Sequence, residues 1–208
     1  MMTRRHAIKV GAVAGLGLAA LPRTVAGTAS LTRDPTGAGA EPAAELAARI
    51  LADRTLSTAR CMARDLLKGG LNAGGNYDQV WIRDTNTFIE VALEVNPPAL
   101  FREALLNFFK FQGDHGDIVD GYRRYDARSV GGARLSSLAP DWMAFKNTVE
   151  TDQESSLVQA LFKYITVTND QGILDEKIAG ITARERLGRA LNYVLTERFD
   201  RKHGLVWG

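Results

Sequence analysis

Residues 98–111 read PALFREALLNFFKF, a run whose leucines and phenylalanines recur at helical spacing. On a helix these side chains occupy nearly every side, whereas a helix lying on a protein surface keeps one polar face. We therefore expect a helix over residues 98–111 that is buried all round. Such a helix requires other elements to cover it.

Apolar residues at helical spacing predict further helices on both sides of this one. They are expected over residues 42–68, over 85–95, from 151 onward and from 182 onward. The last two begin with the capping-box pattern, as Thr151-x-x-Glu154 and Thr182-x-x-Glu185. The sequence shows no run of alternating strands and no βαβ unit. These patterns predict an all-α architecture of paired helices.

The first of these helices carries an apolar stripe of residues that recur at helical spacing. Its members are Leu46, Ile50, Met62 and Leu66. Cys61 lies on the same helix, and no histidine is placed to activate its thiol. We interpret Cys61 as a core residue rather than a nucleophile.

Two irregular segments, residues 71–83 and 113–150, do not fit a plain helical bundle. The second is far longer than the ~12–15 residues of an ordinary connection, and such segments usually carry function or are disordered. Its aromatic residues favour a packed loop. Both segments lead into predicted helix N-termini, which makes them the expected binding face.

Composition limits the classes of protein to consider. The chain has 208 residues, of which 45% are hydrophobic and 24% charged, which is ordinary for a globular protein. One cysteine excludes an internal disulfide, and three histidines disfavour a histidine metal site. We expect no metal and no cofactor.

The N-terminal residues resemble an export signal. Arg4 and Arg5 precede a Gly- and Ala-rich apolar run over 10–21, and small residues follow at 26–29. The run is too short to cross ~30 Å of hydrocarbon, so no stable membrane span is expected. We predict a twin-arginine-type signal peptide at 1–29, a linker at 30–41 and a domain at 42–208. The partner would be the twin-arginine export machinery, and the location periplasmic or extracellular.

Removal of this signal would also change the charge. Residues 1–29 hold four cations and no anion, so 22 cations and 24 anions would remain of the original 26 and 24. A nucleic-acid partner needs a concentrated basic surface, which this balance does not suggest.

The segment from Tyr77 to Thr85, YDQVWIRDT, brings together side chains suited to a sugar. Arg83 offers a planar fork of donors and Asp84 offers acceptors, so the pair could clamp neighbouring hydroxyls. Trp81 or Tyr77 could cover the apolar face of the ring. A structural interpretation competes, in which Asp84 caps the next helix and Arg83 forms a salt bridge.

Three carboxylates, Glu150, Asp152 and Glu154, lie at a loop-to-helix junction. Glycoside hydrolysis needs one carboxyl group to protonate the leaving oxygen and another to activate water or attack. Crowding of carboxylates favours a protonated acid, whereas a helix N-terminus favours the anion. The competing interpretation is that Glu154 completes a capping box and Asp152 merely favours the helix dipole.

A further acidic loop holds Asp114, His115, Asp117 and Asp120. With one histidine and flexible spacing it makes a poor metal site. We interpret it as a polar loop or as a rim that binds hydroxyl groups, with Asp120 as a substrate-binding candidate.

The Trp81-x-Arg83-Asp84 segment resembles that of six-hairpin, (α/α)6-barrel glycosidases, which include glucoamylases, debranching-enzyme glucosidases and exo-α-mannosidases. Residues 150–152, with Tyr164 and Asn169-Asp170 after them, resemble the helix of those families that begins with the general acid. Asn169 stands where those families usually have glycine. The resemblance covers roughly residues 45–208. It implies that Arg83 and Asp84 hold the terminal sugar and that Asp152 is the acid, with Glu150 as the alternative.

The resemblance implies an exported, exo-acting and inverting hydrolase of α-linked carbohydrate, or a truncated piece of one. Its fold would be an incomplete (α/α)6 toroid of helical hairpins, because twelve helices are needed and about half that number is predicted. The general base comes late in such barrels, so we expect this chain to lack it. The alternative function is a non-catalytic carbohydrate-binding remnant on the same scaffold.

Overall fold

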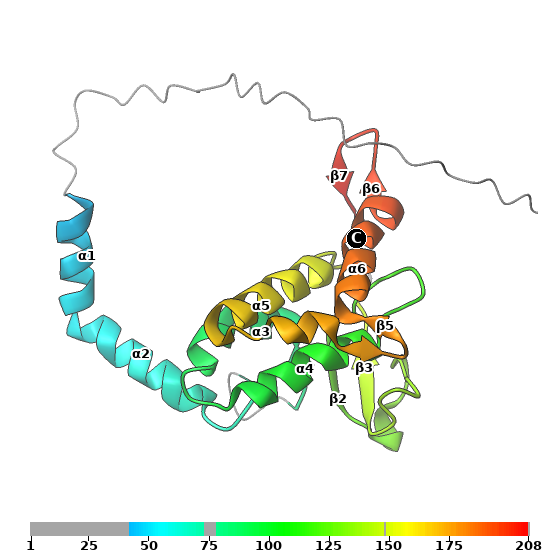
Figure 1. Cartoon of the computed structure of the whole chain (residues 1–208), viewed down its shortest axis with the longest axis horizontal. Helices are drawn as coiled ribbons and strands as arrows, with labels where there is room; N and C mark the ends of the chain where they lie inside the picture. The colour runs from blue at the N-terminus through cyan, green and yellow to red at the C-terminus, as the bar shows by residue number, and fades with distance from the viewer. Residues whose placement is uncertain (1–41, 73–77, 148, 208) are drawn as a thin grey trace, which may run out of the picture. The chain divides into compact units, whose positions relative to one another are not determined.

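The computed structural model describes residues 42–72, 78–147 and 149–207 (Figure 1). The predicted signal peptide and the predicted linker both lie outside the described residues. Within them the chain is 54% helical. The α-helices are α1 Ala43–Ala52, α2 Arg54–Leu67, α3 Ile82–Ala92, α4 Pro98–Lys110, α5 Gln153–Thr168 and α6 Ala183–Glu197. The helix-rich fold expected from the sequence is thus confirmed at this level.

Short strands and two 3₁₀ helices lie between these helices. The strands are β1 Val80–Trp81, β2 Gly121–Arg124, β3 Trp142–Phe145, β4 Lys177–Ile178, β5 Ile181–Thr182, β6 Phe199–Asp200 and β7 Leu205–Val206. The 3₁₀ helices are η1 Ala127–Ser129 and η2 Gln171–Asp175. The expectation of an all-α chain is wrong in this detail, although no predicted helix has become a strand.

Helix α4 contributes much of the core, but it is not buried all round as its sequence predicts, because Glu103 is exposed and Leu106 is only partly buried. Its side chains at Phe101, Leu105, Phe108 and Phe109 are fully excluded from solvent. Helix α5 packs against both α3 and α4 (Figure 1), and Leu157 contributes to the same apolar core. Because α3 and α5 lie side by side, the chain segments that lead into them can meet.

The long segment over 113–150 is not a loop throughout, which corrects the sequence interpretation. It contains β2 and β3, which pair antiparallel with each other, and β2 also pairs with β1. Tyr122 in β2 is buried and packs edge-on against Phe108 and Trp142. A side chain at Gly121 would meet the carbonyl oxygen of Val80 at 2.8 Å, so the close approach of β1 requires glycine there.

The two predicted capping boxes have different outcomes. Thr182 and Glu185 form theirs at the start of α6, as expected. Thr151 and Glu154 do not, because α5 begins after Asp152 and the Glu154 carboxylate instead accepts from the backbone N–H of Ile118 at 2.8 Å. The buried position of Glu154 makes it a tertiary contact rather than a cap.

The first predicted helix is also corrected. It is divided at Asp53, whose side chain caps α2 by accepting from the backbone N–H of Thr55. Cys61 is exposed, so its interpretation as a core residue is wrong. The apolar stripe of this helix is exposed as well; its members are Leu46, Ile50, Met62 and Leu66. Helix α2 is held to the end of α3 at its C-terminal end, where Leu67 is buried and its carbonyl accepts from Asn96.

The C-terminal end of α5 is held by a polar cluster around Asp170. The Tyr164 hydroxyl and the Arg102 guanidinium both donate to its carboxylate at 2.9 Å. Burial raises the pKa of Asp170, but these two donors outweigh it and leave that pKa below its ordinary value of 3.8. The same hydrogen bond, with burial as the larger cause, raises the pKa of Tyr164 to about 12.

We expect Asp170→Asn to lower the free energy of unfolding by about 1 kcal/mol at pH 7, because a partly exposed charged acceptor is lost. A depressed folded-state pKa stabilises the fold above the unfolded-state value of 3.8. That stabilisation disappears as the pH falls through the folded-state value. Urea unfolding of both proteins at pH 7 and pH 3 should show the difference shrinking; an equal difference at both values would contradict this role.

Among the helices that the structure describes, none has the length and apolarity needed to cross a membrane.

Candidate functional site

Three of the predicted site residues meet where α3 and α5 begin. The Arg83 guanidinium forms an ion pair through Nη1 with Oε2 of Glu150, and Nη1 lies 3.5 Å from Oδ1 of Asp152. The three side chains are 36%, 39% and 53% exposed, so they lie at the surface and can reach a ligand. Residues far apart in the sequence therefore form one polar cluster, which we call the Arg83 cluster.

The start of α3 is fixed by buried neighbours of Arg83. Ile82 is fully buried, and its backbone N–H donates to the carbonyl oxygen of Asp120 at 2.8 Å. Thr85 is also buried, and its hydroxyl donates to the carbonyl oxygen of Trp81 at 2.8 Å. The side chains of Ile82 and Thr85 point into the core. The side chain of Arg83 therefore extends toward the start of α5.

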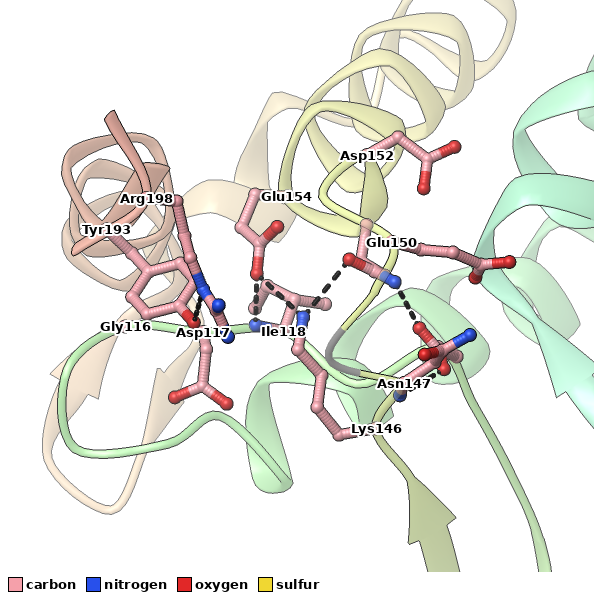
Figure 2. A network of polar contacts seen from close by, with 12 residues as sticks. Gly116, Asp117, Ile118, Lys146, Asn147, Glu150, Asp152, Glu154, Tyr193 and Arg198 are labelled. Atoms are coloured by element: carbon pink, nitrogen blue, oxygen red, sulfur yellow. Dashed lines mark hydrogen bonds and ion pairs between the residues drawn. The ribbon is translucent and has the colours of Figure 1, made fainter. Parts of the chain in front are cut away.

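The start of α5 supplies the carboxylates of the cluster. Asp152 is the residue before the first turn, and its side chain makes no capping hydrogen bond. Figure 2 shows the carboxylates of Glu150 and Asp152 directed to one side of this helix start, with Glu154 on the other side. The unpaired N–H groups of a helix N-terminus attract anions, which favours a cluster of carboxylates here.

The charges of the cluster act on Arg83. Partial burial lowers the pKa of its guanidinium, but the hydrogen bond and charge of Glu150 outweigh burial, and Asp152 and Asp120 add to the effect. The pKa of Arg83 is raised as a result. The guanidinium is a permanent cation that can hold an oxygen-rich ligand next to two carboxylates.

A largely buried polar network lies next to the carboxylates of the Arg83 cluster, and Figure 2 labels its members Lys146, Asn147 and Glu154. The carboxylate of Asp120 accepts from the backbone N–H of Asn147 and from the side-chain amide of Gln153. The Lys146 ammonium donates to Oε1 of Gln153 at 3.1 Å and to Oε1 of Glu154 at 3.2 Å. This network connects the end of β3 with the first turn of α5.

Asp120 itself lies below the rim of the site. It is 4% exposed, and both of its carboxylate oxygens are engaged by protein donors. Burial raises its pKa, although the bonds from Asn147 and Gln153 and the charge of Lys146 oppose that rise. The substrate-binding role predicted for Asp120 stays a prediction. In the structure its carboxylate binds protein donors instead.

The remaining predicted site residues are placed differently. Asp84 is exposed in the first turn of α3, where no side chain caps the helix start. Trp81 is partly buried beside Gly121, so only part of its ring is available to a ligand. Tyr77 lies outside the described residues.

The acidic loop separates into exposed and paired members. Asp114 and His115 are exposed, whereas the carboxylate of Asp117 accepts from the Arg134 guanidinium at 2.7 Å. Within residues 42–72, 78–147 and 149–207, no three His, Cys, Asp or Glu side chains gather in a way that could hold a metal ion.

Sequence patterns alone did not identify Lys146 and Gln153 as parts of the site. A signal was nevertheless present, because Glu154 shares a helical face with Leu157 and Leu161, which are both buried. A carboxylate on a core-facing position needs a buried partner, and a nearby lysine is the natural one. Lys146, eight residues earlier in the chain, meets that need.

The comparisons with known proteins are negative. The chain matches no protein-family model, no curated protein and no solved structure.

Proposed function

We propose that this protein is a glycoside hydrolase that removes a sugar from the end of an α-linked carbohydrate, with inversion at the anomeric carbon. The observation that carries the proposal is the meeting of Arg83, Glu150 and Asp152 at one exposed surface. A sugar needs donors and acceptors side by side for its hydroxyls and a carboxyl group at its glycosidic oxygen. The Arg83 cluster offers both.

The contacts favour Asp152 as the general acid. Glu150 accepts directly from Arg83, so one of its oxygens is already committed to the guanidinium. Asp152 is the more exposed of the two and is 3.5 Å from the same guanidinium nitrogen. Its carboxyl group is free to turn toward a glycosidic oxygen, while Glu150 holds Arg83 in place.

The other roles follow from position. Arg83 and Asp84, consecutive at the start of α3, would hold hydroxyls of the terminal sugar, and the accessible part of Trp81 would contact its apolar face. An inverting reaction also needs a carboxylate base across the ring from the acid. We assign no described residue to that role, so turnover is measured in a protein that also contains this base. Helical hairpins joined by irregular segments, with the site at helix N-termini, support an (α/α)6-type scaffold for this enzyme.

The basic and apolar pattern of residues 1–29 supports export of the enzyme. A carbohydrate hydrolase outside the cytoplasm would act on external polysaccharides or glycans.

The test is a set of α-linked gluco- and manno-oligosaccharides followed by proton NMR. We expect a monosaccharide to be released from the non-reducing end and to appear first as the β-anomer. Calorimetric binding of an oligosaccharide without hydrolysis would contradict the hydrolase and support the carbohydrate-binding remnant. Absence of both binding and hydrolysis would contradict both functions.

A further inference from the structure

A single carboxylate joins the two ends of the segment that carries Glu150 and Asp152. One oxygen of Asp120 accepts from the backbone N–H of Asn147, and the other accepts from the side-chain amide of Gln153. Glu150 and Asp152 lie between these two donors in the sequence. Asp120 therefore fixes both ends of the segment that carries Glu150 and Asp152, the end that follows β3 and the end that enters α5.

The backbone of Asp120 fixes the other half of the site. Its N–H donates to the carbonyl oxygen of Phe145 at 2.8 Å, which joins it to β3. Its carbonyl oxygen accepts from the N–H of Ile82, also at 2.8 Å, and Ile82 immediately precedes Arg83. Asp120 is thus connected to the residue before Arg83 and to both ends of the segment with the two acids.

We propose that Asp120 is a positioning residue that holds Glu150 and Asp152 in register with Arg83, without itself touching the sugar. The inference rests on the proposed function for its consequence in catalysis, but its structural part can be measured separately. Catalytic geometry tolerates little displacement, so a group that fixes both halves of a site affects turnover.

The network explains why a carboxylate is needed at this position. Asp120 accepts on both oxygens, and an asparagine would place a donor against one of the two donors. Rotation of the Gln153 amide could relieve that conflict. However, Oε1 of Gln153 already accepts from Lys146, so the rotated amide would point its N–H groups at the ammonium. The amide of Gln153 is fixed by Lys146, and the acceptor must come from residue 120.

This arrangement predicts a rescue by exchange of the two side chains. In Asp120→Asn/Gln153→Glu, the new asparagine accepts from Asn147 and donates to the new glutamate. The glutamate keeps the second acceptor for Lys146. The formal charge of the network is unchanged, and every donor again meets an acceptor.

The experiment is amide hydrogen exchange of the full chain, read by NMR at Asn147 and at residues 149–152. We expect exchange of the Asn147 amide to be about tenfold to a hundredfold faster in Asp120→Asn, since its charged acceptor is lost and the new amide donor conflicts with one of the two donors. Gln153→Glu alone sets two carboxylates against each other and should also speed exchange. The double variant should return close to the wild-type rate.

The matched control is Asp117→Asn, in the same irregular segment, whose carboxylate contacts Arg134 instead. It should leave exchange at Asn147 unchanged. Wild-type exchange at Asn147 in Asp120→Asn, or no recovery in the double variant, would overturn the proposal. If Asp120→Asn does not fold, the proposal still requires the double variant to fold. A double variant that also failed to fold would contradict the proposal.

Turnover of an oligosaccharide that the wild type hydrolyses supplies the second readout. Asp120→Asn should lower kcat by about tenfold or more with little change in KM, and the double variant should restore it. Altered exchange combined with inactivity of the wild type would contradict the hydrolase while supporting the structural role of Asp120. Unaltered exchange in an active protein would contradict Asp120 alone.

Discussion

Asp152→Asn should lower the turnover of an α-linked oligosaccharide by about a hundredfold to ten-thousandfold, the usual loss when a general acid is removed. The amide cannot donate a proton to the glycosidic oxygen, while its shape is nearly that of the carboxyl group. Asp152 is half exposed and makes no capping bond, so among the described residues its side chain loses only the 3.5 Å approach to Arg83. The free energy of unfolding should therefore stay near the wild-type value.

Asp175→Asn is the matched control for this substitution. Asp175 is an exposed aspartate that also lies 3.5 Å from an arginine nitrogen, that of Arg184, but it is not part of the Arg83 cluster. Turnover should be unaffected in this variant. Equal rates for Asp152→Asn and the wild type would remove Asp152 from the role of acid.

The largest effect on stability is expected at the Lys146–Glu154 pair. The Glu154 side chain is 1% exposed and that of Lys146 is 11% exposed, with 3.2 Å between Nζ and Oε1. Oε2 of Glu154 is buried and has no hydrogen-bond partner in the described part of the chain. Lys146→Met would leave a buried carboxylate without its cation, and we expect the free energy of unfolding to fall by about 3–5 kcal/mol.

A double variant separates the effect of the unpaired charge on stability from the effect of altered packing. In Lys146→Met/Glu154→Gln both charges are gone, and the glutamine oxygen can still accept from Ile118. Most of the lost stability should return, which urea unfolding of the two single variants and the double variant would measure. Lys68→Met, at an exposed pair with Asp65, should not shift the midpoint measurably. A loss at Lys146 as small as that at Lys68 would show that the buried pair has little role.

The helices could be predicted because their patterns are local. The apolar run over 98–111 and the Thr182–Glu185 capping box each fix a helix through contacts within a few residues. The strands β1, β2 and β3 could not be predicted, because an alternation of apolar and polar residues over two to four positions is too short to detect. Their pairing depends on contacts across the chain, such as the approach of Val80 to Gly121 that only glycine permits.

In the candidate site, too, local features could be predicted from the sequence and contacts across the chain could not. The side chains of Arg83 and Asp152 were recognisable from their types and from their positions before predicted helices. The Thr151–Glu154 pattern misled because Glu154 meets Ile118 and Lys146, partners that only the folded chain brings to it. The exposed stripe of Leu46, Ile50, Met62 and Leu66 shows the converse, since periodicity gives a common face but not what covers it.

The crystal structure of Asp152→Asn with a bound α-linked oligosaccharide tests the central claim most directly. We expect the terminal sugar to lie within hydrogen-bond distance of the Arg83 guanidinium, with its glycosidic oxygen beside residue 152. A sugar bound at another surface, with Arg83 still paired only to Glu150, would contradict the claim that these residues form a glycosidase site.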